Sequence, residues 1–159
     1  MELRQNLQRS KGCTFQAQIT ADYKEELYQF QLECSSDELG NVTFTVISPE
    51  TIAGISGRID DAGGKLTFDD KMLAFPVLAE GLITPVSAPW VFIKTLRSGY
   101  ITSAGSDGED IHATINDSFE EQALQLDFWF DGENVPKRCE IIWQGRRILS
   151  MNVEEFSLL

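Results

Sequence analysis

The chain has 159 residues, of which 42% are hydrophobic and 24% charged, a balance typical of one soluble globular domain. Its formal net charge of -12 argues against nucleic acid as a partner, because a phosphate backbone repels so acidic a protein. No run of about 20 apolar residues is present, so a membrane-spanning helix is not expected. Residues 1–12 lack the apolar stretch of an export leader. We therefore expect a single domain over residues 1–159.

The first elements are a helix and a hairpin. Residues 1–11 predict a short amphipathic helix, because two leucines recur at helical spacing without a helix breaker. Residues 13–23 and 25–34 alternate apolar and polar side chains, which predicts two antiparallel strands joined by a short turn. If that turn lies at the polar residues between the two runs, Phe15 stands opposite Cys34.

A series of short strands follows the hairpin. They are expected at residues 42–46, 50–60, 65–68 and 72–75, separated by polar turns at residues 37–41, 60–64 and 69–71. Gly54 and Gly57 indicate a bulge or a sharp bend in the second of these strands, which a strongly curved sheet requires.

The alternation stops between residues 76 and 99, a stretch that is apolar and rich in proline. Ser87 and Pro89 predict the start of a short helix, which ends at Gly99. Two interpretations of this stretch are open. It fills the core against the sheet, or it forms a movable cover over a cavity that accepts an apolar ligand.

The last third of the chain predicts an antiparallel meander. The expected strands are residues 100–105, 111–116, 124–130, 139–143 and 148–155, with turns at residues 107–110, 131–132 and 144–146. About ten strand-like runs with one apolar face predict a mainly β (α+β) protein. The pattern leaves three architectures open: a sandwich, a barrel, or one curved sheet covered by helices.

Residues that carry chemistry are sparse. His112 is the only histidine, and it alternates with Ile111 and Ala113, so we expect it on the polar face of its strand. No known catalytic motif is present. The carboxylates gather at predicted turns and strand edges, which favours solvated turns over a calcium site. We predict no catalytic residue, no metal site and no cofactor.

The three cysteines are Cys13, Cys34 and Cys139, and none belongs to a CxxC pair. This spacing argues against zinc and redox motifs. The simplest interpretation is that they are small buried apolar residues. A bridge between Cys13 and Cys34 stays open, because the expected hairpin makes them diagonal neighbours on one face.

The order of these features resembles that of the LolA-type lipoprotein carrier superfamily over almost the full length. The resemblance rests on the initial helix and the strand CTFQAQITADY, then on TFTVISPETIAGISG, KLTFDDKMLAF, the proline-bearing helical segment, and the closing run LQLDFWFDGENVPKRCEIIWQGRRILSMNVEEFSL. It implies a strongly curved antiparallel sheet, or incomplete β-barrel, with short helices over its concave face. It also implies a non-enzymatic cell-envelope protein whose export leader, with a lipobox cysteine, has been removed.

From these features we expect a lipid or acyl chain to bind in a concave apolar cavity. The expected lining residues are Phe15, Ile19, Phe30, Phe44, Phe68, Phe75, Trp90, Phe128 and Trp143. The alternative is a protein-interaction module whose core is filled by its own side chains and which is able to form a homodimer. The resemblance implies an extracytoplasmic location, with membrane association only through a lipid anchor outside this chain. A cytoplasmic location stays open on the sequence.

Overall fold

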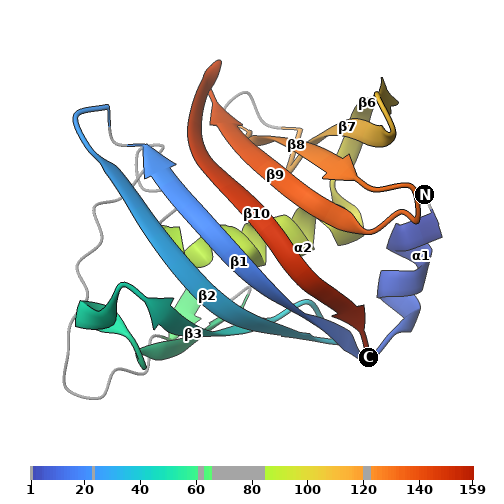
Figure 1. Ribbon diagram of the computed structural model, residues 1–159. Helices are drawn as coiled ribbons and strands as arrows, with labels where there is room; N and C mark the ends of the chain where they lie inside the picture. The colour runs from blue at the N-terminus through green and yellow to red at the C-terminus, as the bar shows by residue number, and fades with distance from the viewer. Residues whose placement is uncertain (1, 23, 61–62, 66–84, 120–122) are drawn as a thin grey trace.

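A computed structural model describes residues 2–22, 24–60, 63–65, 85–119 and 123–159. In these residues one antiparallel sheet of ten strands runs in the order β5-β4-β3-β2-β1-β10-β9-β8-β7-β6. The sheet arches around helix α2, which lies on its concave side (Figure 1). The strands are β1 (Gly12–Asp22), β2 (Leu27–Asp37), β3 (Val42–Ser48), β4 (Ser56–Asp60), β5 (Gly63–Lys65), β6 (Tyr100–Asp107), β7 (Asp110–Asn116), β8 (Gln125–Phe130), β9 (Pro136–Trp143) and β10 (Arg146–Leu158).

The sheet is not closed into a barrel, because β5 and β6 lie at its two ends and do not pair with each other. The expectation of one strongly curved antiparallel sheet with helical cover is therefore confirmed, and the sandwich and the closed barrel are excluded. No helix in the described residues combines the length and apolar character that a membrane span needs.

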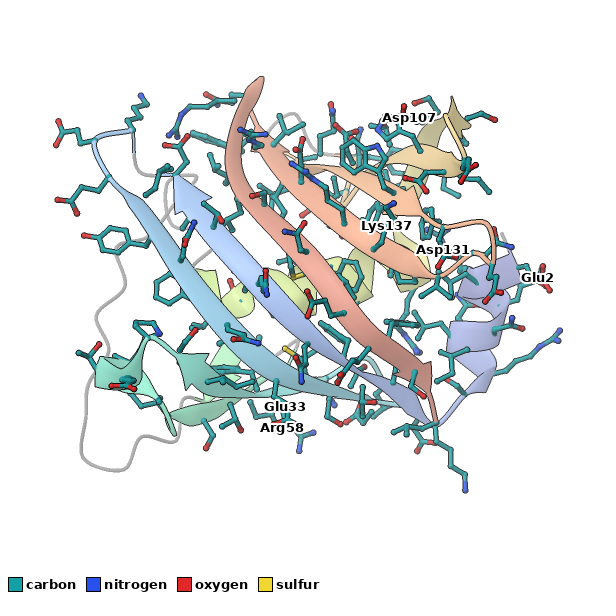
Figure 2. The ribbon with its side chains drawn as sticks, viewed as in Figure 1. Glu2, Glu33, Arg58, Asp107, Asp131 and Lys137 are labelled. Atoms are coloured by element: carbon teal, nitrogen blue, oxygen red, sulfur yellow. The ribbon has the colours of Figure 1, made fainter. Side chains whose placement is uncertain are left out.

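The first hairpin shows how the alternating pattern sets the register. Phe15 pairs with Cys34 as predicted. Strands β1 and β2 stay in register from the pair Gly12 and Asp37 to the pair Asp22 and Leu27. Every second residue of β1 is buried on the concave side, while Gln18 between them is exposed. Charged side chains such as Glu33 are exposed on the opposite, convex face (Figure 2). The period of two thus separates an apolar concave face from a polar convex face.

Helix α2 (Ala88–Ser98) provides the centre of the core. The ring of Phe92, with no exposed surface, lies 5.5 Å from the ring of Phe15 and 5.6 Å from that of Phe128, measured between centroids. One helical side chain therefore contacts both β1 and β8, which are three positions apart in the sheet. The predicted helix is confirmed, although the hydroxyl of Ser87 makes no capping hydrogen bond.

Helix α1 (Glu2–Arg9) packs beside the C-terminal end of α2 (Figure 1). Arg4 Nε donates to the carbonyl of Leu96 at 2.6 Å, which caps α2. Arg97 of α2 bonds in the opposite direction. Its guanidinium donates to the carbonyl of Leu7 in α1 at 3.3 Å and to that of Glu38 at 2.9 Å. This reciprocal pairing fixes both helices and the turn between β2 and β3 to one another.

Two sequence expectations for the middle of the chain need correction. Residues 50–60 are not one strand, because Glu50–Ile52 forms a 3-10 helix and β4 begins only at Ser56. The reason is a turn at Gly54, whose φ is +90° and whose N–H donates to the carbonyl of Val46 at 2.8 Å. Two of the three residues of strand β5, Gly63 and Gly64, fall within the predicted turn at residues 60–64. The strands expected at residues 65–68 and 72–75 lie almost wholly outside the described residues.

The alternation expected in β10 is also interrupted. Ile148 and Leu149 were predicted to point to opposite faces, yet each has only 1% of its surface exposed. The register between β10 and β9 shifts between Arg147 and Leu149, which marks a bulge. A bulge adds one residue to one strand and so breaks the period of two locally.

The turn between β2 and β3 depends on Asp37. One carboxylate oxygen accepts the N–H groups of Leu39 at 2.9 Å and Asn41 at 3.0 Å, and the other accepts the Asn41 side-chain amide at 3.0 Å. Partial burial pushes the pKa of Asp37 upward, but these hydrogen bonds and the charge of Arg58 outweigh it, so the pKa lies below its ordinary value of 3.8. The folded state therefore favours the ionised carboxylate.

We expect Asp37→Asn to lower stability at pH 7, with the loss shrinking as the pH falls. Because the folded pKa is depressed, the stabilisation is present above the ordinary carboxyl pKa and disappears as the pH falls through the folded value. Urea unfolding midpoints of both proteins at pH 7 and at about pH 3 measure this difference. Glu38→Gln, at an exposed neighbouring carboxylate, serves as the control. A gap between Asp37→Asn and wild type of equal size at both pH values contradicts the assignment.

Candidate functional site

The concave face brings together most of the residues predicted to line a cavity. Five of them are buried in one apolar cluster on strands β1, β2, β3 and β8: Phe15, Ile19, Phe30, Phe44 and Phe128. Trp90 and Trp143 are partly buried and pack against the same cluster. Phe68 and Phe75 lie outside the described residues. The predicted set thus converges on the wall that α2 covers, and whether it contacts a ligand stays a prediction.

Helix α2 is short compared with the width of the described sheet. The 11 residues of α2 span about 16 Å at 1.5 Å per residue. Ten strands spaced about 4.8 Å apart give an arch about 43 Å wide along its curved surface. Helix α2 by itself therefore spans only part of the arch, although the five buried residues of the concave face have at most 6% of their surface exposed.

Trp143 adds a polar feature to the apolar wall. It lies on the same side of β9 as Ile141, which is buried. Its indole Nε1 is buried, and in the described part of the chain it has no hydrogen-bond acceptor. An unpaired buried donor costs about 1–3 kcal/mol. By contrast, Nε1 of Trp129 on the convex side donates to the carboxylate of Asp107 at 3.0 Å. An acceptor brought by a ligand would pair the Trp143 donor.

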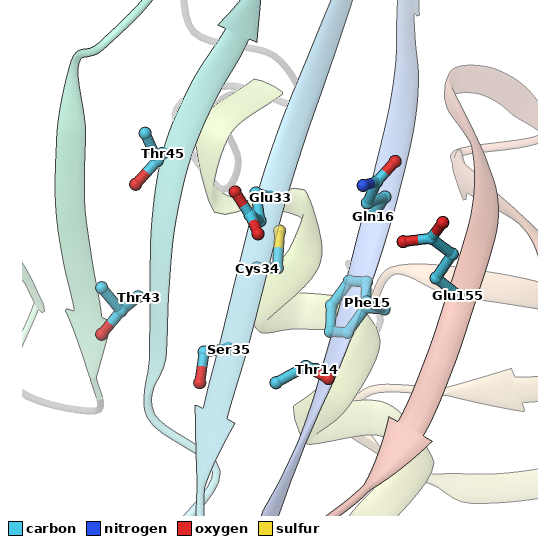
Figure 3. Close-up of a pocket in the computed structure, with 9 residues that line it drawn as sticks. All are labelled: Thr14, Phe15, Gln16, Glu33, Cys34, Ser35, Thr43, Thr45 and Glu155. Carbon is cyan, nitrogen blue, oxygen red and sulfur yellow. The ribbon is translucent and has the colours of Figure 1, made fainter.

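The convex face carries a different kind of surface. A pocket of about 280 Å³ lies over β1, β2, β3 and β10 (Figure 3). Its lining is mainly hydroxyl, amide and carboxylate side chains from Thr14, Gln16, Glu33, Ser35, Thr43, Thr45 and Glu155. Such a surface offers an acyl chain little apolar contact, so the convex side is the weaker candidate for a lipid site.

His112 lies on the convex face, as its alternation with buried Ala113 predicted. Its ring stacks on Trp129 with 4.8 Å between centroids, and its Nε2 lies 3.4 Å from a carboxylate oxygen of Asp127. The hydroxyl of Thr114 donates to the same oxygen at 2.7 Å. These contacts connect β7 to β8. Among the residues that the structure describes, no three His, Cys, Asp or Glu side chains are grouped so as to hold a metal ion.

All three cysteines are buried thiols, which agrees with the simpler of the two sequence interpretations. Burial raises the pKa of Cys13 to about 12, against a smaller opposing effect of the nearby Arg97 charge. Burial also raises the pKa of Cys34 and of Cys139 well above the ordinary thiol value. A thiol that resists ionisation is a poor nucleophile, so these cysteines act as core residues.

Sequence comparison finds neither a matching protein-family model nor a matching curated protein. Among solved structures, the chain is similar to an uncharacterized conserved protein from Thermus thermophilus, with a TM-score of 0.51 and 10% identity over 99% of this chain and 85% of that one. It is also similar to a LolA superfamily protein from Nitrosomonas europaea, with a TM-score of 0.48 and 8% identity over 99% and 92% of the two chains. A putative outer membrane lipoprotein-sorting protein domain from Vibrio parahaemolyticus gives a TM-score of 0.43 and 7% identity over 99% and 89%.

The chain has the fold that the order of its elements predicted, an unclosed, curved antiparallel sheet with a helix on the concave side, and it is similar in fold to the Thermus thermophilus protein. At identities of 10% or less, similarity shows the fold alone. Any statement about activity must therefore come from the chain's own surfaces.

Proposed function

We propose that this is a non-enzymatic protein of the cell envelope that binds a lipid by holding its acyl chain against the concave face of the sheet. The observation that supports it most is the apolar concave face, which belongs to a sheet that is wider than the helix packed against it. The resemblance of the chain to the LolA-type lipoprotein carrier superfamily supports an extracytoplasmic location.

Burial of apolar surface provides the driving force. Each methylene group removed from water contributes about 0.8 kcal/mol, so ten buried methylenes contribute about 8 kcal/mol before the cost of association is subtracted.

Native mass spectrometry after mild extraction tests the proposal. We expect the protein to retain a fatty-acid or phospholipid mass, and we expect Trp90→Ala to weaken the binding of an apolar fluorescent dye several-fold. Trp90 is partly buried against the apolar cluster, whereas Trp129 lies on the convex side, so Trp129→Ala is the matched control. A protein free of lipid that also fails to bind the dye contradicts lipid binding.

One observation favours a second function, in which the core is filled by the protein's own side chains and a protein partner docks on the sheet. All eight residues of the end strand β6 are exposed, and its outer edge has no neighbouring strand in the described sheet. An exposed edge is able to accept an additional strand from a partner or from a second copy. A dimer or a stable complex that forms without any bound lipid supports this alternative.

A further inference from the structure

We propose that a pocket at the C-terminal half of α2 binds the negatively charged head group of an acyl lipid. This inference rests on the proposed function and specifies the class of lipid. The pocket has a volume of about 290 Å³ and lies where α1, α2 and the turn between β2 and β3 meet. It is lined by Gln8, Leu39, Gly40, Trp90, Lys94, Arg97 and Ser98.

The charge of this pocket is opposite to that of the whole protein. The chain has 25 acidic and 13 basic residues, yet no aspartate or glutamate is among the described residues that line the pocket. In the described part of the chain, no carboxylate lies within ion-pair distance of Lys94 or Arg97. Two cations without a counter-ion at one pocket favour an anionic ligand.

Arg97 is held in place without being neutralised. Its guanidinium donates to the backbone carbonyls of Leu7 and Glu38, which are dipoles rather than charges. Gly40 allows this arrangement, because a Cβ at that position would lie 3.2 Å from Cδ of Arg97, and its φ of +87° suits glycine. The Arg97 charge is therefore fixed at the pocket. Lys94 is exposed at the same pocket.

The same pocket has an apolar side. Trp90, Lys94 and Arg97 are spaced at i, i+4 and i+7 and so lie on one face of α2. The Lys94 ammonium lies 4.9 Å from the centroid of the Trp90 ring, and the ring packs against the apolar cluster. Leu39 projects from the turn with 75% of its surface exposed. Cations beside an indole and an exposed leucine match a ligand that has an anionic head and an apolar tail.

The net charge of -12 does not prevent such binding. At physiological ionic strength the Debye length is about 8 Å, so carboxylates farther away than this are largely screened. The acidic residue next to the lining residue Leu39 in the sequence is Glu38. Its side chain is exposed, and its backbone carbonyl is the group that contacts Arg97. Local charges therefore decide the preference at the pocket, while the net charge reduces the rate of approach of anionic lipids.

The test compares two lysolipids with the same acyl chain, below the concentration at which they form micelles. Lysophosphatidylglycerol carries a net negative charge and lysophosphatidylcholine does not. We expect the anionic lysolipid to bind about fivefold more tightly to the wild type, the size of effect expected from one partly exposed charged contact. Lys94→Gln should reduce the preference, because only the Arg97 charge then remains at the pocket. Lys24→Gln, an exposed lysine in the distant turn between β1 and β2, should retain it.

Equal affinities for the two lysolipids, or a preference of unchanged size in Lys94→Gln, overturns the head-group site and leaves acyl-chain binding intact. Absence of binding by both lysolipids overturns the proposed function together with this inference. Glycerol phosphate, which has no acyl chain, separates the two sources of the anion. If it binds in a Lys94-dependent manner while neither lysolipid binds, the pocket is a site for free phosphate esters and the lipid assignment is wrong.

Discussion

Gly12→Ala is expected to lower the free energy of unfolding by at least about 4 kcal/mol or to prevent folding. A Cβ at this position would lie 1.8 Å from the carbonyl oxygen of Ser36, a contact with backbone that a side-chain rotation cannot relieve. The φ of +125° is strained for any other residue. Gly12 also accepts the N–H of Leu159 at 2.9 Å, so the clash falls where the two ends of the chain meet.

Gly54→Ala is the matched control for this substitution. Its φ of +90° is also positive, but a Cβ there would have no heavy atom within 4 Å. Only the cost of the backbone conformation should remain, about 1–2 kcal/mol. Soluble yield and urea unfolding of both variants measure the difference. Similar losses in the two variants would show that the crowding at Ser36 has no energetic effect and that the close approach of β1 and β2 is described wrongly.

Phe92→Ala should lower the free energy of unfolding by about 3–5 kcal/mol. Phe92 is fully buried and contacts the rings of Phe15 and Phe128. Its removal therefore leaves a cavity between α2 and strands β1 and β8. The rigid strands on either side limit how far the cavity can collapse, which places the cost toward the upper part of the range.

Chemical denaturation followed by far-UV circular dichroism measures this loss. The control is Phe119→Ala, because Phe119 has 83% of its surface exposed and its ring contacts only Tyr100 among the aromatic residues described. The control should change the unfolding free energy by about 0.5 kcal/mol or less. If Phe92→Ala costs no more than the control, α2 is not the helix that holds the concave face together.

Local pattern predicted the hairpin of β1 and β2 down to its register. Alternation in both arms fixes which residues face inward, and the short turn fixes which residues pair, so Phe15 and Cys34 were placed opposite each other. The pairing of β1 with β10 was not predictable in this way. It joins the two ends of the chain, for example Ile19 with Met151, and no turn specifies that register.

The candidate site was likewise predictable only where local sequence pattern determines it. The apolar residues that face inward follow from the period of two, and the position of Trp90 follows from the predicted helix. The head-group pocket was missed, although the spacing of Trp90, Lys94 and Arg97 was visible in the sequence. The pocket also needs Leu39, which lies in a turn more than 50 residues before Trp90 in the sequence. Folding of the sheet brings this turn to the helix. The unpaired indole of Trp143 likewise became apparent only in three dimensions.

The indole N–H signals of the three tryptophans provide the most direct test of lipid binding to the concave face. In a two-dimensional nitrogen-proton NMR spectrum, a palmitoyl lysolipid is titrated into labelled protein and each indole signal is followed. We predict that the Trp90 signal shifts and saturates as the lipid packs against the Trp90 ring, while the Trp129 signal, already bonded to Asp107 on the convex side, stays in place. A saturable shift at Trp129 with Trp90 unchanged, or no shift at any indole with bound lipid present, would contradict binding to the concave face.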